Sequence, residues 1–259
     1  MESVVGSGKE TAAEQFDRMS LMEHLEELRR RVVRAIIAVA VAFLGCWAFV
    51  KPIGEFLARP IYKVLPGYRL AFLGVTDPFI LYVKIAALAA LFVAFPVVMY
   101  QVWRFVAPGL YLRERRWAAP FVILGTLFFV GGGAFAYYVA FPFAIEFLVG
   151  MGSEFEPMIT VDRYFKFLLY VILGLGVMFE LPIVIFLLAQ MGVVTPRFLI
   201  RHFRWAVLLI FVAAAFITPT PDVVNLCLFA VPTIFLYLLG VGAAAIVQRG
   251  KKKGEAEGS

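Results

Sequence analysis

The sequence predicts an all-α integral membrane protein whose six transmembrane helices form a curved, proline-kinked bundle. Of its 259 residues, 63% are hydrophobic and only 16% are charged, and the mean hydropathy is +0.90. Soluble domains carry about 25% charged residues, so this composition excludes an ordinary soluble protein. The net charge of +6 is explained by the uneven distribution of basic residues between loops, so nucleic acid is not an expected partner.

Apolar runs long enough to cross about 30 Å of hydrocarbon define the six spans. They cover residues 32 to 50, 78 to 102, 117 to 142, 164 to 189, 204 to 218 and 223 to 247. Prolines within or beside spans two to six predict bent helices. The fifth run has about 15 residues and covers only about 22 Å, so the bilayer thins there or neighbouring helices shield the mismatch.

The domain organisation follows from these spans. A mobile cytoplasmic tail is expected at residues 1 to 19, one membrane domain at 20 to 248, and a basic, polar cytoplasmic tail at 249 to 259. Seventeen Lys and Arg residues fall on the side of the two termini, against six on the other side. Basic residues are retained in the cytoplasm, so both termini are predicted to be cytoplasmic and the long loops 51 to 77 and 143 to 163 face outward.

The segment before the first span combines acidic and basic residues. The sequence Ser20-Leu21-Met22-Glu23 matches a capping box and predicts that a helix begins at Ser20. Four apolar residues then form one stripe on this helix: Leu21, Leu25, Leu28 and Val32. Glu26 and Glu27 stand four residues before Arg30 and Arg31, and such pairs contribute about 0.2 to 0.5 kcal/mol each. From this segment alone, helix stabilisation explains the glutamates as well as ligand binding does.

Two charged residues lie inside predicted spans. Glu180 follows thirteen uncharged residues in the fourth span, where a carboxylate costs several kcal/mol unless it is protonated, hydrated or paired. We therefore expect it to face the bundle interior or a hydrated concavity, either in a function or as a hydrogen-bond clamp between helices. Lys84 lies near the outer end of the second span, where its stem can reach the interface.

The sequence contains no pattern that indicates a metal site, a disulfide framework or an enzyme active site. Cys46 and Cys227 lie in apolar runs, and His24 and His202 are the only histidines, so neither a disulfide framework nor a metal site is indicated and no cofactor is expected. Phosphate-binding-loop, zinc-protease and serine-hydrolase motifs are absent from the sequence. We therefore do not expect an enzyme.

Four dispersed motifs carry a resemblance to a known family. They are Glu-His-Leu-x-Glu-Leu-Arg before span one, Phe-x-x-Pro-x-Leu-Tyr-x-x-Glu-Arg-Arg between spans two and three, Phe-Glu-x-Pro in span four, and Thr-Pro-x-x-Asp after span five. In this order, over residues 20 to 248, the chain resembles TatC, the polytopic receptor subunit of the twin-arginine protein translocase. The resemblance implies a receptor for the paired arginines of signal peptides on folded cargo proteins.

The resemblance also implies roles for particular residues. Glu27 and Glu114 bind the signal peptide at the cytoplasmic face, and a guanidinium fork matches a carboxylate better than a lysine ammonium does. The other residues with implied roles are Phe105, Pro108, Leu110 and Arg29 at the signal-peptide site, Glu180 in the membrane, Pro60 in the first outer loop and Asp222 after span five. In the family a glutamine often follows that aspartate by four residues; here the position is Leu226, preceded by Asn225, and both are weak candidates for a partner contact.

The implied partners are the single-span proteins TatA and TatB, with transport driven by the proton motive force and a homo-oligomer within the receptor complex. The sequence shows no plastid transit peptide, so a bacterial or archaeal cytoplasmic membrane is the expected location. Two alternatives stay open. A small-solute secondary transporter would use proline-broken spans and an intramembrane carboxylate, whereas an intramembrane hydrolase would need a second catalytic group beside Glu180.

Overall fold

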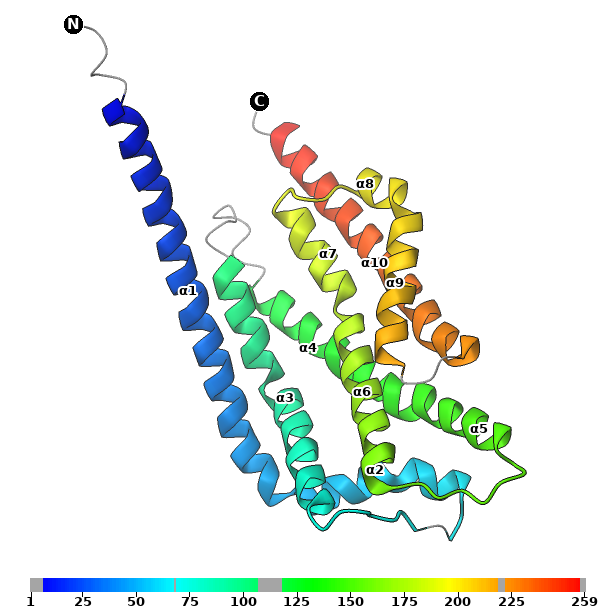
Figure 1. The fold of residues 1–259 in the computed structure, drawn as a ribbon. Coiled ribbons are helices and arrows are strands. Elements are labelled where there is room, and N and C mark those ends of the chain that lie inside the picture. The colour runs from blue at the N-terminus through cyan, green and yellow to red at the C-terminus, as the bar shows by residue number, and fades with distance from the viewer. Residues whose placement is uncertain (1–6, 68, 107–117, 219–221, 257–259) are drawn as a thin grey trace, which may run out of the picture.

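A computed structural model describes residues 7 to 67, 69 to 106, 118 to 218 and 222 to 256, and side chains from 22 to 248 within these ranges. The described chain is almost wholly helical (Figure 1). The elements are α1 (Ser7–Ala48), α2 (Val50–Val64), α3 (Asp77–Val106), α4 (Ala118–Phe135), the π-helix η3 (Ala136–Ala140), α5 (Phe141–Met151), α6 (Val161–Phe179), α7 (Leu181–Gln190), α8 (Pro196–Arg201), α9 (Phe203–Ile217) and α10 (Val223–Ala256).

The predicted spans are confirmed as apolar helices of membrane-crossing length. Five stretches are long enough, namely Met22–Ala48, Asp77–Val106, Ala118–Met151, Val161–Gln190 and Val223–Gln248. The expected short span is the 15-residue helix α9. Figure 1 places the N- and C-terminal ends of the described chain at the same end of the bundle, opposite α2.

The prediction that the first helix begins at Ser20 is wrong. Helix α1 runs without interruption from Ser7 through the first span. The residues ahead of Ser20 include Ala12, Ala13, Glu14 and Gln15, which are strong helix formers. Their propensity extends the helix backwards, so the capping-box sequence lies inside the helix and does not mark its start.

The first outer loop also contains a helix that the span count did not predict. Helix α2 is amphipathic: Lys51, Glu55, Arg59 and Lys63 are exposed at four-residue intervals, whereas Leu57 and Ile61 are buried. It crosses the end of the bundle opposite the termini (Figure 1). Its charged face therefore lies where a membrane surface would be.

Pro60 inside α2 shapes a contact with the third span. A proline has no amide hydrogen, so the Phe56 carbonyl, four residues earlier, lacks its usual helical donor. The Tyr137 hydroxyl donates to that carbonyl at 2.5 Å, and the Tyr164 hydroxyl donates to the Leu57 carbonyl at 3.0 Å. Hydrogen bonds from two tyrosines, one in η3 and one in α6, thus connect α2 to the bundle next to Pro60.

Two spans are interrupted close to prolines, as the sequence predicted for a bent bundle. The third span passes from α4 through η3 into α5, and Pro142 lies in the first turn of α5. The fourth span breaks at Glu180, between α6 and α7, with Pro182 in the first turn of α7. The missing proline amides explain why regular helical hydrogen bonding fails at these points.

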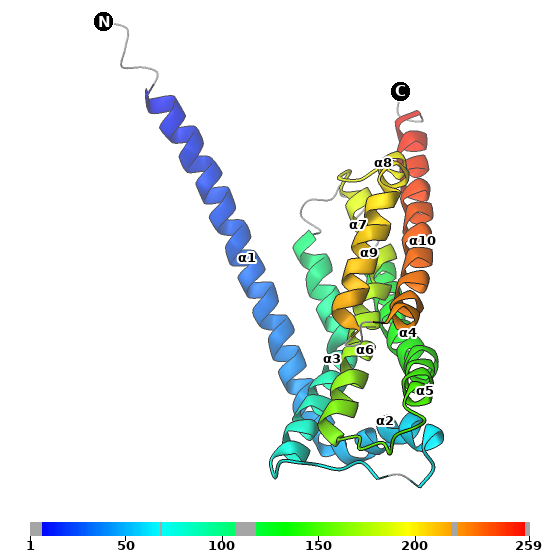
Figure 2. The ribbon, with the colours of Figure 1, turned by 45° about the vertical axis from the view of Figure 1, so that its right-hand side comes forward.

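Packing around α6 forms the centre of the molecule. Helices α4 and α6 approach closely at Gly132, where an added Cβ would lie 2.7 Å from the Leu175 carbonyl oxygen. Phe129 is fully buried nearby and stacks on Phe95 with ring centroids 3.7 Å apart. At the α2 end, the two long loops pair where the Val161 amide donates to the Ala71 carbonyl at 2.8 Å. Helix α1 lies at the edge of the bundle beside α3 (Figure 2).

Candidate functional site

The predicted recognition site lies where α1 passes the last turns of α3, near the termini. The His24 ring of α1 stacks on the Phe105 ring of α3, with centroids 4.6 Å apart and planes inclined by 30°. Phe105 was a candidate from the sequence, whereas His24 was not. This contact joins the acidic segment before span one to the segment between spans two and three.

The geometry distinguishes Glu27 from its neighbours. The Arg31 guanidinium donates to the Glu27 carboxylate at 3.0 Å, and the two side chains are 12% and 30% exposed. The equivalent Arg30 and Glu26 atoms are 3.8 Å apart, and the Glu26 side chain is 72% exposed. The i,i+4 pairing predicted from the sequence is therefore present, but only Glu27 belongs to a partly buried pair.

Two residues of α3 that sequence reasoning left out complete this cluster. The Arg104 guanidinium donates to the Tyr100 hydroxyl at 3.1 Å, and Arg104 lies within electrostatic range of Glu27. Tyr100 is likewise within range of Arg31. The four-residue spacing of Tyr100 and Arg104 was a usable signal, but Arg104 counted in the sequence only toward the topology of its loop.

Only one of the remaining candidate residues at this end of the bundle lies within the described residues. Glu114, Pro108 and Leu110 lie outside the described residues. Arg29 is described and its side chain is exposed. The structure therefore brings together Glu27 and Phe105 from the predicted set, and adds His24 and Arg104.

Glu180 stands at the break between α6 and α7, deep in the fourth span. Neither carboxylate oxygen has a hydrogen-bond partner among the described residues, and both are buried. One oxygen lies near α4, where a Cβ on Gly125 would approach it to 3.4 Å. The Phe129 backbone of α4 lies within interaction range of this carboxyl group. Glu180 therefore faces the neighbouring helix α4 without a hydrogen bond of good geometry.

The residues after span five form a helix cap. The Asn225 backbone amide donates to one Asp222 carboxylate oxygen at 2.7 Å, and the Asn225 side-chain amide donates to the other at 2.9 Å. Asn225 is fully buried and Leu226 is half-buried against the core. Asp222 thus stabilises the start of α10, and Leu226 is more accessible than Asn225.

Lys84, the other charged residue within a predicted span, forms an ion pair between two helices. Lys84 of α3 pairs with Asp162 of α6 at 2.9 Å, and both side chains are about half exposed. This pair fixes the position of Lys84 at the end of the bundle where the long loops meet. In the part of the chain that the structure describes, there is no group of three or more His, Cys, Asp and Glu residues arranged to hold a metal ion.

Comparison with known proteins agrees with the motif pattern. The family described as "Sec-independent protein translocase protein (TatC)" matches residues 23–232. The chain is 47% identical over 245 residues to the TatC of Koribacter versatilis, covering 92% of this chain and 90% of that protein. It is 36% identical over 238 residues to the TatC of Aquifex aeolicus, covering 91% and 98%.

A solved structure shows the same fold. The "Crystal Structure of Twin Arginine Translocase Receptor- TatC" superimposes with a TM-score of 0.77 at 35% identity, covering 87% of this chain and 99% of that chain. The relatives are named as translocase proteins, so the expectation of a non-enzyme is confirmed, and neither the transporter nor the hydrolase alternative gains support. The chain belongs to the TatC family, the multi-pass membrane proteins of the twin-arginine translocase.

Proposed function

We propose that this chain is the receptor subunit that binds twin-arginine signal peptides at the cytoplasmic face of the membrane. Family membership supports a role in Sec-independent translocation. The observation that carries the finer proposal is the partly buried Glu27 carboxylate between α1 and α3. It is the acidic group of the predicted set that the described structure places in a shielded, polar and aromatic setting.

Glu27 has bonding capacity left for a ligand. The contact with Arg31 joins one guanidinium nitrogen to one carboxylate oxygen, which is a single-point contact. An incoming arginine can form two parallel hydrogen bonds to a carboxylate, whereas a lysine ammonium cannot match that fork. Arginine of the signal peptide therefore competes with Arg31, and Glu114 binds the second arginine.

The surrounding cations contribute to selectivity in this proposal. Arg31 and Arg104 keep the cluster positively charged, so a ligand cation is opposed unless it forms directed hydrogen bonds to the carboxylate. Phe105, Pro108 and Leu110 shape the apolar side of the site. Arg29, two residues after Glu27 on α1, is exposed.

Assembly and energy coupling complete the proposal. The chain works in the cytoplasmic membrane with both termini in the cytoplasm, as one of several copies in a receptor complex with TatB and TatA. Leu226, which is half-buried near the start of α10, is the more accessible of the two positions considered for a partner contact. Export uses the proton motive force, and the buried Glu180 carboxyl group is the intramembrane group proposed to act after signal binding.

The test is photo-crosslinking of a twin-arginine signal peptide to the full-length protein in membranes. Hydrogen bonds to charged groups contribute about 1.5 to 3 kcal/mol, so Glu27→Ala should weaken binding about tenfold to a hundredfold. Glu114→Ala should have a similar effect. Glu26→Ala is the matched control, because Glu26 is exposed in the same helix turn.

Membrane insertion of each variant is measured in parallel by protease protection. Unchanged crosslinking in both the Glu27 and the Glu114 variant would refute the carboxylate site. In cells that lack the protein, export of a folded twin-arginine reporter should stop, and it should resume when the gene is returned. Continued export would refute the translocase role.

A further inference from the structure

Two adjoining cavities lie at the α2 end of the bundle, opposite the end where Glu27 and Phe105 lie. The first, of about 250 Å³, lies between α2, α3 and the α4–η3 segment and is almost entirely apolar. The second, of about 330 Å³, lies between α2 and the η3–α5 segment and contains charged groups. Phe56, Tyr137 and Tyr138 line both, so the two cavities meet at an aromatic rim.

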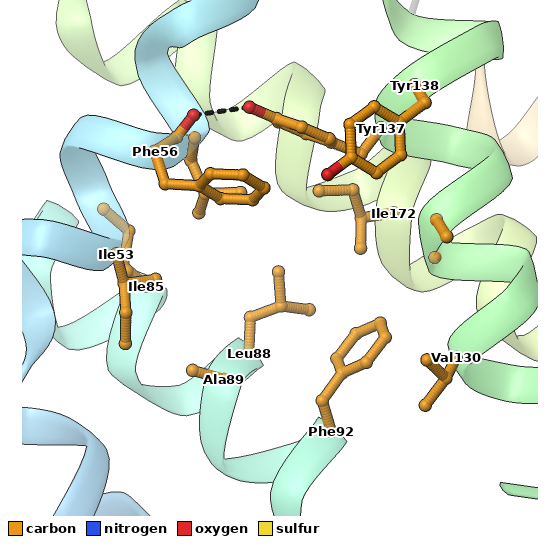
Figure 3. A pocket seen from close by; sticks show the side chains of 13 residues that line it. Ile53, Phe56, Ile85, Leu88, Ala89, Phe92, Val130, Tyr137, Tyr138 and Ile172 are labelled. Carbon is orange, nitrogen blue, oxygen red and sulfur yellow. Dashed lines mark hydrogen bonds between the residues drawn. The ribbon is translucent and has the colours of Figure 1, made fainter.

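The apolar cavity, called here the slot, has a membrane-facing side. Its inner wall includes Ile85, Leu88 and Phe92, and Figure 3 shows Leu88, Ala89, Phe92 and Val130 across the cavity from the aromatic rim. Val130, Ala134 and Tyr138, spaced four residues apart, line its other side and are exposed. The slot therefore communicates with the surface that faces lipid.

The charged cavity, called here the basic pocket, supplies a head-group site. Arg59 and Lys63 line it from α2, and Glu146 lines it from α5. None of the three forms an ion pair within the described residues. Two positive charges and one negative charge leave a net charge of +1, which matches the single negative charge of a phosphate diester.

The aromatic rim between the two cavities is held in place by direct side-chain contacts. The Arg59 guanidinium lies over the Phe56 ring at 5.4 Å, and the Phe56 and Tyr137 rings stack with centroids 4.5 Å apart. The Tyr137 hydroxyl is occupied by the Phe56 carbonyl. The apolar slot, the aromatic rim and the basic pocket thus lie in the same order as the acyl chain, the ester region and the phosphate of a phospholipid.

We propose that the slot and the basic pocket together bind one phospholipid with a net negative headgroup. An acyl chain fills the slot through the side lined by Ala134, and the phosphate accepts hydrogen bonds from Arg59 and Lys63. Glu146 accepts from a headgroup hydroxyl and disfavours a headgroup that carries its own carboxylate. The occupant comes from the leaflet at the α2 end, because the charged face of α2 lies there.

The experiment uses the full-length protein in nanodiscs that contain phosphatidylglycerol with a photoreactive diazirine in one acyl chain. After illumination, crosslinked peptides are identified by mass spectrometry. Crosslinks should concentrate in the peptides that contain Leu88, Phe92 and Val130, and unlabelled phosphatidylglycerol should compete for them. Phosphatidylcholine with the same acyl chains should compete less well.

Variants separate the two parts of the site. Ala134→Trp fills the slot and should reduce slot crosslinks at least fivefold, with Val139→Trp, an exposed position outside the slot, as control. Arg59→Gln and Lys63→Gln should each reduce them about fivefold, with the exposed Arg163→Gln as control at the same end of the bundle. Ala134→Leu is the second slot variant if the tryptophan variant fails to fold.

Two results would overturn the proposal. Crosslinks spread evenly over the exposed faces of all helices, and insensitive to both Ala134 variants, would show ordinary annular lipid only. Crosslinks in the slot that are unaffected by either charge variant, and equally competed by phosphatidylcholine, would show that no anionic headgroup is recognised. Peptide recognition at Glu27 is measured separately and does not depend on either result.

Discussion

Replacement of Tyr137 by Phe should destabilise the protein in a way that depends on Pro60. Because Pro60 cannot donate, the Tyr137 hydroxyl supplies the hydrogen bond that the Phe56 carbonyl would otherwise receive within α2. The carbonyl is partly buried, and a hydrogen bond of this kind contributes about 1 kcal/mol. Loss of the hydroxyl should therefore lower the free energy of unfolding by about 1 kcal/mol.

The decisive measurement is a double-mutant cycle. In a Pro60→Ala background, the new backbone amide can donate to the Phe56 carbonyl, so Tyr137→Phe should then cost only a few tenths of a kcal/mol. The free energy of unfolding is measured by titrating SDS into dodecyl maltoside micelles. Tyr138→Phe serves as control, because the adjacent Tyr138 side chain is exposed. Equal costs of Tyr137→Phe in both backgrounds would refute the reasoning.

Three further predictions concern other contacts. Gly132→Ala should destabilise the protein by about 1 to 3 kcal/mol, because the new Cβ would lie 2.7 Å from a backbone carbonyl of α6. The control Gly131→Ala meets no atom within 4 Å and should leave the melting temperature unchanged or raised. Equal effects of the two substitutions would contradict this packing. Lys84→Met should cost less than about 1 kcal/mol, because its pair with Asp162 is half exposed; a larger loss of unfolding free energy would mean that the pair is shielded from water. Glu180→Gln should spare crosslinking of the signal peptide and lower export of a folded reporter, and loss of crosslinking would place Glu180 in binding or in the fold instead.

The spans were predictable because apolar run length directly reflects membrane thickness. Helix α2 was missed for a different reason. Its residues alternate between a charged and an apolar face, so it lacks a long uncharged run, and its two prolines, Pro52 and Pro60, are more typical of a loop than of a helix. The four-residue spacing of Lys51, Glu55 and Arg59 against Leu57 was the available signal for an amphipathic helix.

The candidate site was predictable only in part. The motif resemblance indicated Glu27 and Phe105, but i,i+4 spacing alone treats Glu26 and Glu27 alike. What separates them is the tertiary position of α3, which brings Arg104 within electrostatic range of Glu27 and leaves Glu26 in solvent. The helix start at Ser20 failed because a local capping pattern was outweighed by the helix propensity of the residues before it.

The edge position of α1 has a mechanical consequence. Among the described residues, the buried core begins at Val50, and the membrane window of α1 contributes no buried residue to it, although Phe43 packs against it. A small tilt of α1 therefore disturbs its contact with α3 and leaves the packing of the other spans intact. The separation of Glu27 and Arg104 is set by the packing of one helix pair, α1 against α3. A substitution that changes the angle between these two helices should therefore alter the proposed recognition site before it alters the other spans.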